Sequence, residues 1–189
     1  MDFKDPYVYE GTSVLINRLN IKDKAKLDLA ENKFVTYRGS KDIPRGNFDL
    51  EHLKSIHKHL FQDIYDWAGQ IRYVNIHKGG CNFHPYQLIE VGMSDIHKRL
   101  IKQKYLTNLY PREFATQAGI IIGDINTLHP FREGNGRTQL NYLKQLGLRA
   151  GYIIDLEKID PHKWIEASIK AHDADYKDMQ DCIARAIDV

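Results

Sequence analysis

The chain has 189 residues, enough for one domain with a hydrophobic core of its own. Apolar residues make up 42% of it and charged residues 28%, which excludes a disordered or fibrous chain. The 27 Lys and Arg residues nearly balance the 25 Asp and Glu residues, so charge indicates neither a nucleic acid nor a membrane surface as partner.

The hydrophobic segments and the cysteines indicate the cellular compartment of the protein. No apolar run is long enough to span a membrane, and the polar N-terminus lacks the apolar core of a signal peptide. Only two cysteines occur, Cys81 and Cys182, far apart in sequence. We therefore expect free thiols in a cytoplasmic protein.

Hydrophobic periodicity predicts three helices and one hairpin in the first half of the chain. Residues 24–37 carry a weak helical pattern, and Asp49 caps a stronger one that continues to residue 69. Residues 70–83 are typical of a short β-hairpin with two glycines in its turn. A further helix follows from residue 85 to about residue 100.

The second half is predicted to be entirely helical. A wide apolar stripe over residues 111–128 indicates a helix at the centre of a bundle, ending at His129. Another helix begins near Arg137 and is expected to run until the glycines at 147 and 151 disrupt it. Two more are expected near residues 162–172 and 176–187. The predicted fold class is mainly α, a single domain with one short hairpin.

Residues 129–137, between two predicted helices, read His-Pro-Phe-Arg-Glu-Gly-Asn-Gly-Arg. The run Gly134-Asn135-Gly136 lets backbone N–H groups converge on an anion at a helix start. Glu133 is an oxygen ligand suited to Mg²⁺, and Arg137 carries a fork of donors that matches phosphate oxygens. His129 can accept a proton from a hydroxyl at neutral pH.

Each of these residues also has an ordinary structural interpretation. Gly-Asn-Gly is common in loops, His-Pro often marks a helix end, and single charges are usually solvated. The occurrence of a base, a metal ligand, an anion nest and a cation within nine residues favours a phosphate-handling site. By contrast, His52, His57 and His59 share one predicted helix without a recognisable zinc spacing, so we assign them no metal.

This segment resembles the Fic motif, His-x-Phe-x-(Asp/Glu)-Gly-Asn-Gly-Arg-x-x-Arg, at every defined position except the last. The resemblance extends to the opening Asp5-Pro6-Tyr7, to residues 63–69 and to the hairpin ending at Phe83. It therefore covers nearly the whole chain, which we identify as a bacterial member of the Fic family and treat as one Fic domain over residues 1–189.

The resemblance implies a helical fold whose central loop binds ATP and Mg²⁺, with the hairpin as a flap that presses a target protein against it. Typical members transfer AMP to a protein hydroxyl. Carried over to this sequence, His129 deprotonates a target Tyr, Ser or Thr, and Glu133 holds Mg²⁺. Gly134, Asn135 and Gly136 cradle the α-phosphate, and Arg137 offsets charge on the departing pyrophosphate. Phe131 pins the loop to the core.

The sequence departs from the motif at Leu140, where the family has a second Arg that helps to bind the terminal phosphate. Three interpretations are open: weaker ATP binding with AMP transfer retained, another nucleotide or phosphate donor, or a catalytically silent binding module. We favour weakened or altered transfer because His129 and Glu133 are both present. The loss of one charged hydrogen bond costs about 1.5–3 kcal/mol, which weakens a site without necessarily abolishing it.

Partners are also suggested by the resemblance. Many Fic proteins carry an inhibitory helix with the pattern (Ser/Thr)-x-x-x-Glu-(Gly/Asn). Here Glu31-Asn32 has Leu27 at the hydroxyl position, and Glu10-Gly11 has Pro6, so neither pair matches. This points to the toxin-like class in which a separate small antitoxin supplies the helix. We expect cytoplasmic action on a protein target, without membrane or direct nucleic-acid binding, and leave delivery into a host cell open.

Overall fold

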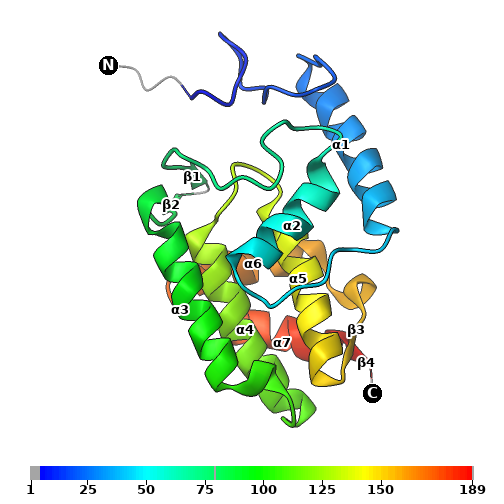
Figure 1. The fold of residues 1–189 in the computed structure, drawn as a ribbon, viewed down its shortest axis with the longest axis vertical. Helices are drawn as coiled ribbons and strands as arrows, with labels where there is room; N and C mark the ends of the chain where they lie inside the picture. Colours follow the sequence, from blue (N-terminus) through cyan, green and yellow to red (C-terminus); the bar gives the residue numbers. More distant parts are fainter. Residues whose placement is uncertain (1–4, 79, 189) are drawn as a thin grey trace.

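A computed structural model describes residues 5–78 and 80–188 of the chain, and these are mainly helical (Figure 1). The helices are α1 (Lys24–Gly39), α2 (Leu50–Phe61), α3 (Ile89–Lys102), α4 (Pro111–Leu128), α5 (Asn135–Ala150), α6 (Pro161–His172) and α7 (Lys177–Ala186). Two antiparallel pairs of short strands accompany them, β1 (His77–Lys78) with β2 (Cys81–Asn82) and β3 (Ile153–Ile154) with β4 (Ile187–Asp188). Three short 3-10 segments lie at Tyr86–Leu88, Lys104–Leu106 and Leu156–Lys158. The predicted mainly helical fold class is confirmed.

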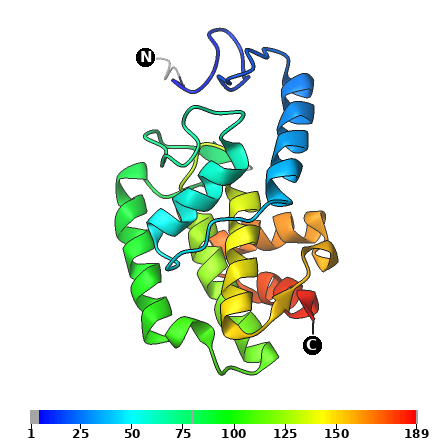
Figure 2. The same ribbon diagram turned by 45° about the vertical axis from the view of Figure 1, so that its right-hand side comes forward.

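The α4 helix is the centre of the bundle, as its wide apolar stripe predicted. It packs against α3, α5, α6 and α7, and Phe114, Ile122 and Ile125 on it are fully buried. Burial of each such side chain stabilises the fold by about 1.5–3 kcal/mol. In both views α3 flanks the bundle on one side and α1 stands on the other (Figures 1 and 2). The α4 and α5 helices thus hold the motif loop between them from inside the core.

The two helices that approach the motif loop from the first half of the chain begin at capping aspartates. Asp23 accepts a hydrogen bond from the backbone N–H of Lys26 at the start of α1, and Asp49 accepts one from His52 at the start of α2. The cap predicted at Asp49 is confirmed. The α1 helix packs on α2, and α2 packs on α5. Both helices therefore bring side chains close to the start of α5.

Two predictions on element boundaries are wrong, and one pair of strands was not predicted. The α2 helix ends at Phe61 rather than near residue 69, because the chain continues in turns that finish at Gly69 with φ of +81°. The α5 helix does not break at Gly147, since the missing Cβ of that residue admits the side chain of Ile154, and it ends at Ala150 before Gly151, the second glycine predicted to disrupt it. The β3–β4 pair was not expected, because two-residue strands give no periodic pattern.

None of the helices in the described ranges is both long enough and apolar enough to cross a membrane.

Candidate active site

His129 ends α4 in the left-handed conformation, with φ of 47° and ψ of 64°. Its Nδ1 atom lies 3.2 Å from the carbonyl oxygen of Asn126, and its ring stacks on Phe83 with 3.7 Å between the centroids. The tautomer that satisfies the carbonyl carries the proton on Nδ1, which leaves Nε2 with a free lone pair. Among the described residues, none makes a hydrogen bond to Nε2. His129 is thus arranged to accept a proton there.

The surroundings of His129 keep it neutral. Burial lowers the pKa of His129 to about 4, and the positive charges of Arg72 and Lys78 act in the same direction. The hydrogen bond to Asn126 and the charge of Glu133 oppose the shift. Because the pKa lies well below 7, the imidazole is unprotonated at neutral pH, as a general base requires.

The loop after His129 is pinned by its own side chains. Asn135 accepts a hydrogen bond from the backbone N–H of Phe131 at 2.9 Å and donates one to its carbonyl oxygen at 2.7 Å. Phe131 is fully buried and stacks on His57 with 3.9 Å between the ring centroids. The Asn135 side chain is therefore committed to the loop, and only its backbone N–H is left for an anion.

The glycines on either side of Asn135 differ in whether the structure leaves room for a side chain. Gly134 adopts φ of +81°, and a Cβ there would lie 2.3 Å from the ring of Phe61, so the position excludes a side chain. Gly136 is exposed, and a Cβ there would meet nothing within 4 Å. The backbone N–H groups of Asn135, Gly136 and Arg137 donate no hydrogen bond within the described part of the chain. They form an open helix N-terminus suited to an anion.

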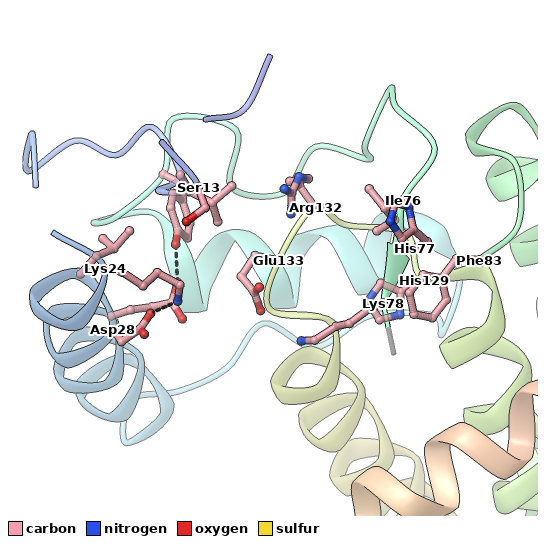
Figure 3. Close-up of a pocket in the computed structure, with 14 residues that line it drawn as sticks. Ser13, Lys24, Asp28, Ile76, His77, Lys78, Phe83, His129, Arg132 and Glu133 are labelled. Atoms are coloured by element: carbon pink, nitrogen blue, oxygen red, sulfur yellow. Dashed lines mark hydrogen bonds and ion pairs between the residues drawn. The ribbon is translucent and has the colours of Figure 1, made fainter. Parts of the chain in front are cut away.

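A pocket of about 500 Å³ lies between the motif loop, the flap and α1 (Figure 3). Of the predicted site residues, His129 and Glu133 line it, together with Phe83 and Lys78 from the flap and Glu31 from α1. Gly134, Asn135, Gly136 and Arg137 follow Glu133 directly but do not line it.

Glu133 is half-buried, and its Oε1 atom accepts a hydrogen bond from the N–H of Gly134 at 2.8 Å. The same oxygen lies 3.7 Å from Nη2 of Arg137. In residues 5–78 and 80–188 no three His, Cys, Asp or Glu side chains gather into a group that could hold a metal. A cation at Glu133 would therefore need further oxygen ligands from water or from a phosphorylated substrate.

Arg137 is already paired, which the sequence did not predict. Its Nη2 atom lies 2.6 Å from Oε1 of Glu31 on α1, and its guanidinium stacks over the ring of Phe61 at 4.8 Å. Glu31 is only 7% exposed and also accepts a hydrogen bond from the hydroxyl of Tyr65. Burial and the Glu31 carboxylate together raise the pKa of Tyr65, so the phenol keeps its proton. Much of the positive charge of Arg137 is therefore offset by α1.

Arg72 is a residue whose role the sequence did not indicate. It is 1% exposed, and its guanidinium donates hydrogen bonds to the carbonyl oxygens of Val74, His84, Leu128 and His129 at 2.6–3.0 Å. These carbonyls belong to both ends of the flap and to the end of α4. The only signal in the sequence is an Arg between apolar neighbours in the predicted hairpin, where an exposed charge is the ordinary expectation.

His57, to which no role was assigned, supports the loop from α2. Its Nε2 donates to the carbonyl of Glu133 at 3.0 Å, and its Nδ1 accepts from the N–H of Gly69 at 2.8 Å. Burial lowers the pKa of His57 to about 3, so it remains neutral. Leu140 lies one turn after Arg137 on α5, half-buried against the hydrophobic core. It presents no charge to the start of α5.

Residues 47–145 match the model of the Fic/DOC family. The chain is also 38% identical over 185 residues to the probable protein adenylyltransferase y4lH of Sinorhizobium fredii, covering 97% of this chain and 96% of the relative. The chain belongs to the Fic/DOC family. The resemblance drawn from the motif is thereby confirmed, with Leu140 as a departure within the matched region.

The chain is also similar to a longer relative and to two solved structures. The protein adenylyltransferase VbhT of Bartonella schoenbuchensis is 42% identical over 89% of this chain, which spans only 36% of the length of VbhT. The crystal structure of BepC from Bartonella tribocorum with bound AMPPNP is 27% identical with a TM-score of 0.88, covering 96% of each chain. A Fic domain from Bartonella quintana with bound ADP is 28% identical with a TM-score of 0.88, covering 96% of this chain and 94% of the other.

Proposed function

We propose that this chain is a protein adenylyltransferase that moves AMP from ATP to the hydroxyl of a Tyr, Ser or Thr side chain on a target protein. The observation that carries the proposal is the neutral His129, whose free Nε2 accompanies Glu133 in one pocket beside the open start of α5. The names of the relatives and the AMPPNP and ADP bound to similar Fic domains support the same reaction.

In the proposed reaction, Nε2 of His129 takes the proton of the target hydroxyl. The oxygen forms a bond to the α-phosphorus of ATP, the bond from that phosphorus to the bridging oxygen breaks, and pyrophosphate leaves. The N–H groups of Asn135, Gly136 and Arg137 bind the α-phosphate oxygens as charge shifts onto them. Positioning and electrostatics supply the rate enhancement, as in other transfers to phosphorus.

Mg²⁺ fits the proposed site at Glu133. The carboxylate lines the pocket, and Mg²⁺ in nucleotide sites is commonly held by one or two carboxylates, substrate phosphates and water. When bound, the ion would offset phosphate charge. Arg137 adds less positive charge than the motif suggests because Glu31 shares it.

A second candidate is the transfer of another nucleotide or phosphate-linked group by the same base and nest. Leu140 and the Glu31–Arg137 pair favour it, since both reduce the positive charge available to a triphosphate. A catalytically silent nucleotide-binding module is the third candidate. In that case nucleotide would raise the melting temperature of the protein, but no modified target would form.

The setting we propose is a cytoplasmic toxin whose inhibitory helix comes from a separate small antitoxin protein. The absence of the (Ser/Thr)-x-x-x-Glu-(Gly/Asn) pattern from this sequence supports a partner in trans. Purification from the native source tests this. A small protein that carries the pattern and co-purifies in a stoichiometric complex would support it, and isolation as a lone monomer would contradict it.

The adenylyltransferase proposal is tested with ATP labelled on the α-phosphate, in parallel with ATP labelled on the γ-phosphate, with Mg²⁺ and a bacterial lysate. We expect protein-bound label from the α-position alone, absent with His129→Ala. Replacing ATP by the other nucleoside triphosphates separates the first two candidates. Label from neither position would contradict transfer from ATP.

A further inference from the structure

The cations around the pocket are almost all committed to carboxylates. Lys24 lies 2.5 Å from Asp28 at the α1 end, and Arg132 lies 2.6 Å from Asp5. Arg137, beside the pocket, is held by Glu31. Lys78 is the exception, since it forms no ion pair within 4.0 Å with any residue in the described ranges. It is the lining cation whose charge is left for a ligand.

The position of Lys78 is set by the flap. It lies on β1 opposite Cys81, and the ends of the flap are tied by Arg72 and by the stacking of Phe83 on His129. Figure 3 shows the Lys78 side chain below His129, with its ammonium end pointing away from the strand toward the side of the pocket where Glu133 lies. The positive charge also acts on the titration of His129, which places it within electrostatic reach of the reacting centre.

The side chains beside the start of α5 carry a net negative charge, so a bound phosphate group would need a further cation. Glu31 and Glu133 contribute two negative charges and Arg137 one positive charge, while Leu140 contributes none. A nucleoside triphosphate carries several negative charges, of which one bound divalent cation offsets only a part. Phosphate binding in a site with net negative side-chain charge is unfavourable unless another cation approaches.

We propose that Lys78 binds the phosphates of the donor nucleotide and so supplies, from the flap, the positive charge that position 140 lacks. The proposal rests on the proposed function, because it concerns the same donor. It makes the flap part of the nucleotide site as well as a surface for the target.

The test is equilibrium binding of ATP, ADP and adenosine with Mg²⁺, measured by calorimetry on the His129→Ala protein so that no transfer occurs. We expect Lys78→Met to weaken ATP and ADP binding by about 10-fold or more, which is about 1.4 kcal/mol, and to leave adenosine binding unchanged. Lys78→Arg keeps the charge and should stay within about 3-fold of the parent.

The matched control is Lys24→Met, at the far α1 end of the pocket, where the ammonium is paired with Asp28. It should change ATP binding by less than about 2-fold, as expected for an exposed ion pair. In a Leu140→Arg background the loss caused by Lys78→Met should shrink, because the two cations would serve the same phosphates.

The outcomes separate the two proposals. If the His129→Ala protein binds ATP and the added Lys78→Met leaves that binding unchanged, the inference is overturned. A loss of target labelling by Lys78→Met in the protein that keeps His129 would then assign the lysine to the target protein instead. If the parent binds no ATP at all, the adenylyltransferase function itself fails, and the role of Lys78 fails with it. Equal losses for adenosine and ATP would also overturn the inference, because they would indicate a distorted flap.

Discussion

His129 owes its chemistry to its backbone and its neighbours. The left-handed turn at the end of α4 directs the ring toward Phe83, and the Asn126 carbonyl selects the tautomer. The sequence predicted His129 as the proposed base, because an imidazole can accept a proton at neutral pH and the residue lies within the motif. It did not predict the lowered pKa, which depends on burial and on Arg72, 57 residues away.

The pH dependence of transfer follows from that pKa. A base with a pKa of about 4 in the free protein is unprotonated throughout the neutral range, so kcat/KM should stay flat from about pH 8 to about pH 5.5 and fall at lower pH. An ordinary histidine would lose half of its base form at about pH 6.5. Initial rates of AMP incorporation across this range check the prediction, and an inflection near pH 6.5 would contradict it.

Gly134 and Gly136 give a matched pair of substitutions. Gly134→Ala forces a Cβ against Phe61 in a left-handed backbone, so the melting temperature should drop markedly. Gly136→Ala meets no protein atom, so the fold should keep its melting temperature within a few degrees while nucleotide binding weakens because the methyl group obstructs the anion. Thermal melts and ATP titrations distinguish the two. Unchanged ATP binding in Gly136→Ala would argue against the anion site.

At the scale of elements, the flap is attached to the bundle through Arg72. Its guanidinium donates hydrogen bonds to the carbonyl oxygens of Val74 and His84 in the flap and of Leu128 and His129 at the end of α4, two segments that lie far apart in the sequence. The short β1–β2 pair alone would be marginal as an isolated hairpin. The position of the flap over His129 therefore depends on this buried side chain more than on the strands.

We expect Arg72→Lys to loosen the flap. Lysine cannot reproduce the fork, and each buried carbonyl left without a donor costs about 1–3 kcal/mol. Urea denaturation should show a lower free energy of unfolding, and hydrogen exchange should increase at residues 74–84 more than in α4. Arg18→Lys is the control, since that arginine pairs with Asp66 at the surface. Equal exchange in the flap of both variants would contradict the role of Arg72.

The helices were more predictable than the contacts between them. Local periodicity and caps indicated the helix over 111–128 and the start of α2 at Asp49. Local pattern carries no information on which distant groups meet, so the pairing of Glu31 with Arg137 and the bridge of His57 to Glu133 were missed. The predicted helix break at Gly147 was wrong because this glycine makes room for the side chain of Ile154, a tertiary contact that local pattern does not indicate.

For the whole molecule, neutral buried histidines link stability to pH. Burial lowers the pKa of His57 to about 3 and that of His129 to about 4, and burial also lowers the pKa of His52. Unfolding returns these groups to a pKa of about 6.5. The unfolded chain therefore binds more protons than the folded one below about pH 6.5, so the free energy of unfolding falls as the pH falls.

The expected size is up to about 1.4 kcal/mol per pH unit for each such histidine. Urea denaturation at pH 7 and at pH 5 should thus show a clear loss of stability. His57→Gln should be less stable at pH 7, because it loses the bridge between Gly69 and Glu133, but should lose less on going to pH 5. A pH effect equal to that of the parent protein would contradict the assignment of His57 as a neutral buried group.

We propose that a site with Leu140 in place of the second Arg still transfers AMP. Its most direct test is the mass of the modified protein after incubation with ATP and Mg²⁺, compared between the parent and His129→Ala. We expect the target, or the chain itself, to gain the mass of one AMP group, and the gain to be absent with His129→Ala. A gain equal to phosphate, or a gain that survives in His129→Ala, would contradict it.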